Sequence, residues 1–190
     1  KIVKVVGLRH QEPGATIIYF SLISSLEKMA QELEKLNIPH LRYHGQLNDQ
    51  MRRHNQEIFL TSTDALMLAT PAFGLGINKP DIRQIMHVEL PGSLEAYYQE
   101  IGRSGRDAKE AQTHLFYDPD DVSIQEDFIK WAVPDPGFIC GLHNLLCRRR
   151  HEVQAGGLDY LRAQLNFYNQ RDFRVETTLN LLERWGGLDW

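Results

Sequence analysis

Two arginines, Arg103 and Arg106, stand three positions apart in the sequence, and a glycine precedes each of them. An apolar repeat at helical spacing lies just before them and predicts a helix over residues 93–102. If that helix continues, Gln99, Arg103 and Arg106 fall on one face, and the two glycines hold no ligand away from it. Such a face suits a polyphosphate, because each guanidinium offers paired donors to phosphate oxygens and keeps its charge. A solvated basic helix end is the alternative, and this segment alone leaves it open.

Short β-rich runs alternate with amphipathic helical stretches before residue 120. The predicted strands cover residues 16–20, 40–43, 66–69, 84–88 and 113–117, and the predicted helices between them cover 22–36, 48–59 and 93–102. Several of the strands are continuous apolar runs, which are typical of strands buried on both faces of a parallel sheet. The alternation predicts a doubly wound α/β sheet, whose ligands bind at the carboxyl ends of the strands.

The two ends of the chain differ from this pattern. Residues 1–7 form a short β-like apolar run. Two prolines and a glycine within residues 133–137 cannot continue a helix and predict a break there. The chain then reads as helical, with candidates over residues 139–150, 158–167 and 176–185. We therefore expect two domains, residues 1–132 and residues 133–190.

Polar residues follow the predicted strands where a ligand would bind. Ser21 is expected to cap a helix, whose free amides could also hold a phosphate. His44 lies at the turn after the second strand, and Arg52 lies one turn into the next helix. Thr70 opens a loop with two spaced glycines and Asn78, which can offer amides to phosphate or ribose. Ordinary turns and a surface arginine remain the alternatives.

The composition is that of an ordinary globular protein. The 190 residues carry a net charge of −4, so any nucleic-acid binding must rest on local patches. The two cysteines give no disulfide framework, which fits a reducing cytoplasm. No signal peptide and no membrane-spanning apolar run is apparent. Because the first residue is Lys1 rather than methionine, we expect the chain to be part of something longer.

Residues 69–80, 97–107 and 115–119, in this order, resemble the second motor domain of RecQ-type helicases in helicase superfamily two. Ala-Phe-Gly-Leu-Gly-Ile-Asn-Lys-Pro, residues 72–80, resembles motif V of that family, and residues 97–107 resemble motif VI. Residues 17–21 are similar to motif IV. The resemblance implies a RecA-like, doubly wound, mostly parallel sheet. The last predicted helices, within residues 172–185, themselves resemble the start of a winged-helix or helix-turn-helix unit.

The resemblance also implies roles for single residues. Arg106 would be the arginine finger that reaches the γ-phosphate of ATP, and Arg103 would support the phosphates or couple two motor domains. The residues expected near the nucleotide are Gln99, Gly76 and Asn78. Those expected near the phosphates of single-stranded DNA are Ser21, His44, Arg52 and Thr70.

The implied activity is that of an ATP-dependent 3′–5′ DNA helicase of DNA repair and recombination. It would act on single-stranded and duplex DNA in the cytoplasm, associated with a bacterial nucleoid. ATP and Mg²⁺ would be held mainly by a first motor domain. The sequence contains neither a phosphate-loop motif nor an acidic magnesium motif, so we expect residues 1–190 alone to be inactive.

Two alternatives remain: an RNA helicase or remodeller of the same superfamily, and a nucleic-acid-binding module without a motor. Gln99 favours the DNA helicase, because the RNA enzymes more often have histidine at that position.

We predict no metal site. Cys140, His143, Cys147 and His151 share one helical face, but a straight helix spreads them over about 16 Å, too far for one ion. Buried thiols and satisfied histidines explain these residues better.

Overall fold

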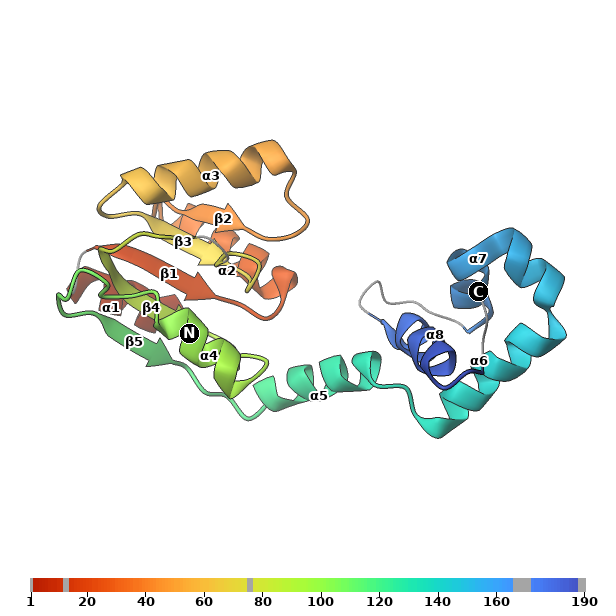
Figure 1. The fold of residues 1–190 in the computed structure, drawn as a ribbon. Coiled ribbons are helices and arrows are strands. Elements are labelled where there is room, and N and C mark those ends of the chain that lie inside the picture. Colours follow the sequence, from red (N-terminus) through yellow and green to blue (C-terminus); the bar gives the residue numbers. More distant parts are fainter. Residues whose placement is uncertain (1, 12–13, 75–76, 166–171, 188–190) are drawn as a thin grey trace. The chain divides into compact units, whose positions relative to one another are not determined.

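The computed structural model describes residues 2–11, 14–74, 77–165 and 172–187. The chain divides into two compact units, Lys1–Val122 and Ser123–Trp190, which we describe separately (Figure 1). The first unit contains all the strands found among the described residues, and the second is helical.

The first unit is built on a five-stranded sheet in the order β2-β3-β1-β4-β5, and every neighbouring pair is parallel. The strands are β1 (Ala15–Tyr19), β2 (Leu41–Tyr43), β3 (Leu66–Ala69), β4 (Ile82–His87) and β5 (Gln112–Leu115). Their carboxyl ends share one edge, because Tyr19 at the end of β1 pairs with both Ala69 and His87. The predicted doubly wound α/β sheet is confirmed.

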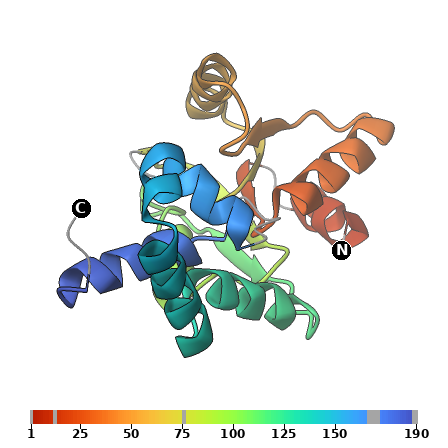
Figure 2. The same ribbon diagram turned by 90° about the vertical axis from the view of Figure 1, so that its right-hand side faces the viewer.

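Helices cover both faces of this sheet. α1 (Ile2–Gln11) and α2 (Ile23–Lys35) pack on one face, and they lie on the same side of the strands in Figure 2. α3 (Asp49–Thr61) and α4 (Leu94–Ile101) pack on the other face through Phe59 and Ile101. α2 buries Leu26, Ala30 and Leu33, which recur every three or four residues along one side of the helix.

The prediction of a β-like run at residues 1–7 is wrong over residues 2–7, which lie in helix α1, and Lys1 lies outside the described residues. Val5 is buried against the α2 side of the sheet, whereas Val3 is exposed. Arg9 fixes the end of the helix by donating to the carboxylate of Asp64 at 3.0 Å. Burial of one side of a helix and this distant ion pair outweigh the strand preference of the β-branched residues.

Capping side chains begin the two helices on the α3 side of the sheet. Asn48 accepts a hydrogen bond from the amide of Met51 at 2.8 Å at the start of α3. Ser93 accepts one from the amide of Ala96 at 3.1 Å at the start of α4.

The second unit is made of α5 (Asp121–Ala132), which begins at the end of the first unit, α6 (Pro136–Arg148), α7 (Arg150–Gln164) and α8 (Arg174–Arg184). The predicted break over residues 133–137 is present: α6 starts with Pro136 at its first turn and Asp135 as its cap. α7 is interrupted at Gly157, where φ is 56°, immediately before the predicted helix start at residue 158. The last residues of that predicted helix, 166–167, lie outside the described residues.

Helices α6, α7 and α8 of the second unit enclose a small apolar core, which consists of Leu142, Val153, Leu161, Val175 and Leu179. Across the ranges that the structure describes, we find no helix with the length and apolarity needed to cross a membrane.

Candidate functional site

Three of the predicted site residues follow neighbouring strands at the carboxyl edge of the sheet. Ser21 follows β1, His44 follows β2 and Thr70 follows β3. The strand order places Thr70 between the other two. The loop that Thr70 opens then runs to residue 78, and the two arginines of the glycine-rich motif bind to it. This loop is therefore the shared element of the candidate site.

The two arginines do not continue α4, so the condition under which they would share a helical face with Gln99 is not met. α4 ends at Ile101 with Gly102 as its cap. Gly105 then takes φ of 63°, a left-handed conformation that ends the helical path, and its amide donates to the Ile82 carbonyl at 3.1 Å. We call residues 102–108 the arginine turn.

Asp107 ties the far end of the arginine turn to the sheet. Its carboxylate accepts from the Arg83 guanidinium at 2.5 Å, and this hydrogen bond holds the pKa of Asp107 below its ordinary value. Its backbone amide donates to the Pro80 carbonyl at 3.3 Å. The turn is therefore held by both β4 and the loop that precedes it.

Arg103 points inward, toward the loop after β3. Its guanidinium donates to the Gly74 carbonyl. A Cβ built on Gly74 would lie 2.6 Å from Nη2 of Arg103, so only glycine allows this approach without a shift of Arg103. Arg103 therefore links the arginine turn to this loop.

Arg106 is exposed, and it binds the same loop farther along. Its Nη1 donates to the Ile77 carbonyl and its Nε donates to the Gly102 carbonyl, both at 3.2 Å. These two bonds use two of the five N–H donors of a guanidinium. The bonds orient the side chain, and the exposed remainder of the group can receive an anion.

Two of the three residues expected near the nucleotide are exposed in the structure, namely Gln99 on α4 and Asn78 in the loop. Gly76 lies outside the described residues. Lys79, next to Asn78, is buried instead and forms an ion pair with Asp81 at 2.9 Å, which lowers the pKa of Asp81.

Ser21 does not cap α2, contrary to the prediction. The helix begins at Ile23, and the hydroxyl of Ser21 donates to the Leu90 carbonyl at 2.8 Å. The carboxylate of Glu89 accepts from the amides of Ser21 and Leu22, at 2.8 and 3.0 Å. A carboxylate is the stronger acceptor at a helix start, and β4 ends where Glu89 can reach it. A phosphate at these amides would have to displace Glu89.

His44 is only 4% exposed. Its Nε2 lies 2.9 Å from Oε1 of Glu27, whose other oxygen accepts from Arg42 at 2.9 Å. Glu27 belongs to α2, so this cluster ties the end of β2 to that helix. The imidazole faces the protein, and contact with a nucleic acid at this position would involve the backbone of the neighbouring turn.

Thr70 and Arg52 complete the predicted set. Thr70 is buried, its amide donates to the Tyr43 carbonyl at 3.1 Å, and its carbonyl accepts from Phe73 at 2.9 Å. Arg52 forms a close ion pair with Asp49 on α3, which lowers the pKa of Asp49 and raises that of Arg52. Arg52 therefore has to exchange Asp49 for a phosphate if it binds DNA.

Three polar residues close to the arginine turn form a buried cluster that their types and spacing do not predict. Tyr19, His87 and Glu100 are all buried. One signal was available: His87 is a polar residue within the apolar run of β4, and such a residue needs a buried partner. The identity of that partner depends on the tertiary structure.

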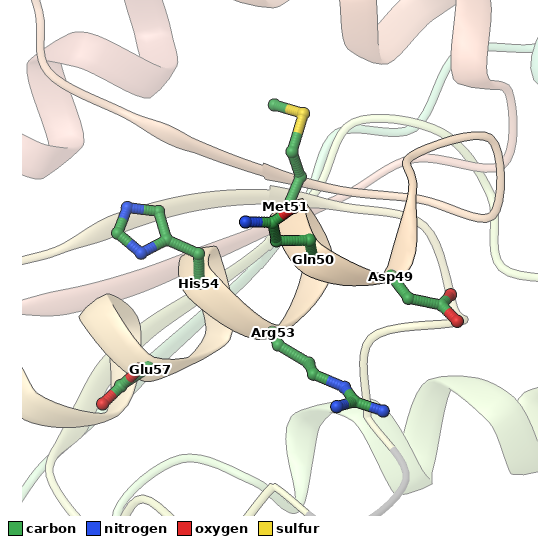
Figure 3. Close-up of a pocket in the computed structure, with 6 residues that line it drawn as sticks. All are labelled: Asp49, Gln50, Met51, Arg53, His54 and Glu57. Atoms are coloured by element: carbon green, nitrogen blue, oxygen red, sulfur yellow. The ribbon is translucent and has the colours of Figure 1, made fainter.

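The described residues of α3 also line an open hollow of about 720 Å³, formed by Asp49, Gln50, Met51, Arg53, His54 and Glu57. Figure 3 shows that these side chains spread around one helix and point in different directions. They do not converge on a common point, so this hollow does not define a binding site.

Within the described ranges, no three His, Cys, Asp or Glu side chains gather where they could hold a metal ion. Cys140 and Cys147 are exposed rather than buried, so the expectation of buried thiols is wrong. Both lie on α6, where Sγ of Cys147 is 3.8 Å from Nε2 of His143.

The parallel sheet, the glycine-rich loop and the arginine turn together define a RecA-like helicase lobe. Residues 1–108 match the family described as the helicase conserved C-terminal domain, and the chain belongs to this family. The resemblance to RecQ-type helicases of superfamily two is also confirmed by the similar proteins.

Two of these relatives show the degree of similarity. The ATP-dependent DNA helicase RecQ of Bacillus subtilis is 37% identical over 122 residues, which cover 64% of this chain and 20% of that protein. The bifunctional 3′-5′ exonuclease/ATP-dependent helicase WRN of Mus musculus is 39% identical over 116 residues, which cover 61% of this chain and 8% of that protein. The matched region thus spans a fifth or less of these relatives.

Solved structures agree on the fold. Domain 2 of the DEAD-box helicase Mss116p, bound to an RNA duplex, matches with a TM-score of 0.57 at 16% identity, covering 96% of this chain and 80% of that one. Dbp5 of S. cerevisiae, bound to RNA and ADP BeF3, matches with a TM-score of 0.56 at 19% identity, covering 66% of this chain and 34% of that one. At these identities the likeness establishes the RecA-like lobe alone.

Proposed function

We propose that this chain works as the second motor domain of an ATP-dependent 3′–5′ DNA helicase, joined to a first motor domain that holds ATP and Mg²⁺. The observation that carries the proposal is the state of Arg106. It is exposed on the arginine turn, and two backbone carbonyls orient it without neutralising its charge. The relatives named RecQ and WRN, at 37% and 39% identity, support this assignment.

In this proposal Arg106 is the arginine finger. When the cleft between the motor domains closes, its free donors reach the γ-phosphate and stabilise the charge that develops as the phosphoryl group leaves. Arg103, bonded to the Gly74 carbonyl, has its donors turned into the domain. Its proposed part is to couple the loop after β3 to the arginine turn. Gln99 and Asn78 are exposed, and they complete the nucleotide contacts.

The proposed track for single-stranded DNA is the carboxyl edge of β2, β3 and β1. The residues there are Ser21, His44 and Thr70, with Arg52 on the next helix. The side chains of His44 and Thr70 are buried, and the amides of Ser21 and Thr70 already donate to Glu89 and to the Tyr43 carbonyl. The proposed phosphate contacts therefore come mainly from Arg52 and from the backbone of the turn after His44, and Ser21 contributes where a phosphate displaces Glu89. Such contacts fix the phosphates of the strand without reading its bases. Binding of the DNA strand at Thr70 would then affect both arginines, because they donate to the Gly74 and Ile77 carbonyls of the same loop.

Substituting Arg106 in the full protein tests the finger. Arg106→Ala should lower DNA-stimulated ATP turnover by about 10³-fold or more, whereas DNA affinity should stay within about twofold. Arg106→Lys should not restore turnover, because an ammonium lacks the forked donors. Lys109→Ala removes another exposed cation close to the turn and serves as the matched control. Turnover that survives within a few-fold in Arg106→Ala would refute the assignment.

An RNA helicase of the same superfamily is the second candidate. A putative ATP-dependent RNA helicase of Acanthamoeba polyphaga mimivirus is 34% identical over 126 residues. Stimulation of the full protein by single-stranded DNA and by RNA of the same sequence separates the two. Residues 1–190 alone are proposed to show no stimulated hydrolysis, since they lack a phosphate-loop motif.

A further inference from the structure

A buried contact joins β4 to the last turn of α4, just before the arginine turn along the chain. His87 is the last residue of β4 and is 1% exposed, and Glu100 in the last turn of α4 is 6% exposed. Nε2 of His87 lies 2.7 Å from Oε2 of Glu100. An unpaired buried carboxylate would be strongly unfavourable. The pair therefore fixes where the last turn of α4 lies on the sheet.

Tyr19 extends this contact to the loop after β3. Its ring stacks on the His87 ring, with centroids 5.3 Å apart, and its hydroxyl donates to the Phe73 carbonyl at 3.0 Å. Burial raises the pKa of Tyr19 well above its ordinary value, although the nearby Arg103 guanidinium opposes this shift. The phenol thus remains a neutral donor. Arg103 binds the carbonyl of the next residue, Gly74.

The backbone transmits the position of Glu100 to the arginines. The amide of Arg103 donates to the Glu100 carbonyl at 3.2 Å, so a shift of Glu100 moves Arg103 directly. Two residues later, the amide of Gly105 donates to the Ile82 carbonyl at the start of β4. Glu100 thus holds the arginine turn at Arg103, and Ile82 of β4, the strand that also carries His87, holds it at Gly105.

We propose that Tyr19, His87 and Glu100 are positioning residues, which lock the arginine turn against the loop after β3 so that Arg106 is preorganised for the nucleotide. This inference rests on the proposed function, since it assigns these residues to ATP turnover. A purely structural role for the same cluster makes a different prediction. If the role were purely structural, removing one partner would leave the other buried group unpaired and destabilise the fold, so folding, DNA affinity and turnover would fall together.

The test uses the full protein and four variants. Glu100→Ala should lower turnover at saturating ATP and DNA by about tenfold or more, with DNA affinity within about twofold, because the turn loses its support. Glu100→Gln should restore turnover to within about threefold, since an amide can still bind His87. Tyr19→Phe keeps the ring and loses one hydrogen bond, so turnover should fall by about three- to tenfold. Glu95→Gln, an exposed change on the same helix, should leave turnover unchanged.

Three results would overturn the proposal. The first is turnover within about twofold of normal in both Glu100→Ala and Tyr19→Phe. The second is a Glu100→Gln variant as impaired as Glu100→Ala. The third is a parallel loss of turnover, DNA affinity and thermal midpoint, which indicates a structural role. If Glu100→Ala does not fold, Glu100→Gln and Tyr19→Phe decide by the same criteria.

Arg106→Ala, measured alongside, separates this proposal from the proposed function. Normal turnover in Arg106→Ala refutes the finger itself. Impaired turnover in Arg106→Ala with normal turnover in Glu100→Ala and Tyr19→Phe refutes only the positioning role.

Discussion

Gly102 and Gly105 flank Arg103 and look equivalent in the sequence, but replacing each with alanine should have unequal effects. Gly102 has φ of −66°, which any residue adopts, whereas Gly105 has φ of 63°. A Cβ on Gly102 would lie 3.2 Å from the Tyr98 carbonyl oxygen. A Cβ on Gly105 would lie 3.0 Å from the Lys109 carbonyl oxygen and 3.4 Å from Cβ of Ala111.

These geometries set the expected free energies of unfolding. A left-handed conformation costs an alanine about 1–2 kcal/mol. Replacing any glycine with alanine also stabilises the fold by about 0.4–1 kcal/mol, because the unfolded chain loses freedom. Gly105→Ala should therefore destabilise the first unit by about 1 kcal/mol, more if the tight contact with Lys109 is not relieved. Gly102→Ala should stay within about 0.5 kcal/mol of the parent.

Urea unfolding of residues 1–190, followed by circular dichroism, measures the difference. In the full protein, Gly105→Ala should also lower DNA-stimulated turnover by about tenfold or more, because it moves the backbone between the two arginines. Gly102→Ala is the matched control and should retain turnover within about threefold. Equal loss of stability in the two variants, or a larger loss in Gly102→Ala, would refute the assignment of a left-handed Gly105.

Three further predictions follow from single contacts. Ala108 has φ of 61°, so Ala108→Gly should stabilise the fold by about 0.5–1 kcal/mol in urea unfolding, and a loss of stability would contradict this. Arg52→Ala should reduce the salt dependence of DNA binding by about one ion and weaken binding evenly across DNA sequences. Asp49→Asn removes the ion-pair partner of Arg52 and should strengthen DNA binding. A loss of affinity confined to one DNA sequence would count against a phosphate contact. The hydrogen bond from Lys79 lowers the pKa of Asp81, so this pair stabilises the fold above pH 3.8, the ordinary pKa of Asp81, and the stabilisation is lost as pH falls through the lowered pKa. Lys79→Met should therefore lose less free energy of unfolding than the parent between about pH 6 and pH 2. Equal losses in the two proteins over this pH range would exclude the coupling.

Local sequence patterns were sufficient to predict most elements of the fold. All five strands were placed from the sequence, and the buried strands β1 and β3 leave the unbroken apolar signature of strands covered on both faces of a parallel sheet. Ser93 and the prolines near residue 135 marked helix boundaries, since capping and proline geometry act within a few residues. The Gly-Arg spacing of Arg103 and Arg106 indicated the centre of the candidate site, because it is also a local pattern that spans only a few residues.

The state of each site residue was decided by partners that are distant in the sequence. Glu89 replaces Ser21 at the start of α2, and Glu27 buries the imidazole of His44. Residues 2–7 became part of a helix through packing on the sheet, and Gly105 ended the helical path in contact with β4. Such outcomes depend on which carboxylate or carbonyl the folded chain brings within about 3 Å, and local spacing carries no information about that distance. The sequence by itself therefore predicted candidate residues around the arginines, whereas only the tertiary structure decided which of their side chains are buried or exposed and revealed the cluster of Tyr19, His87 and Glu100.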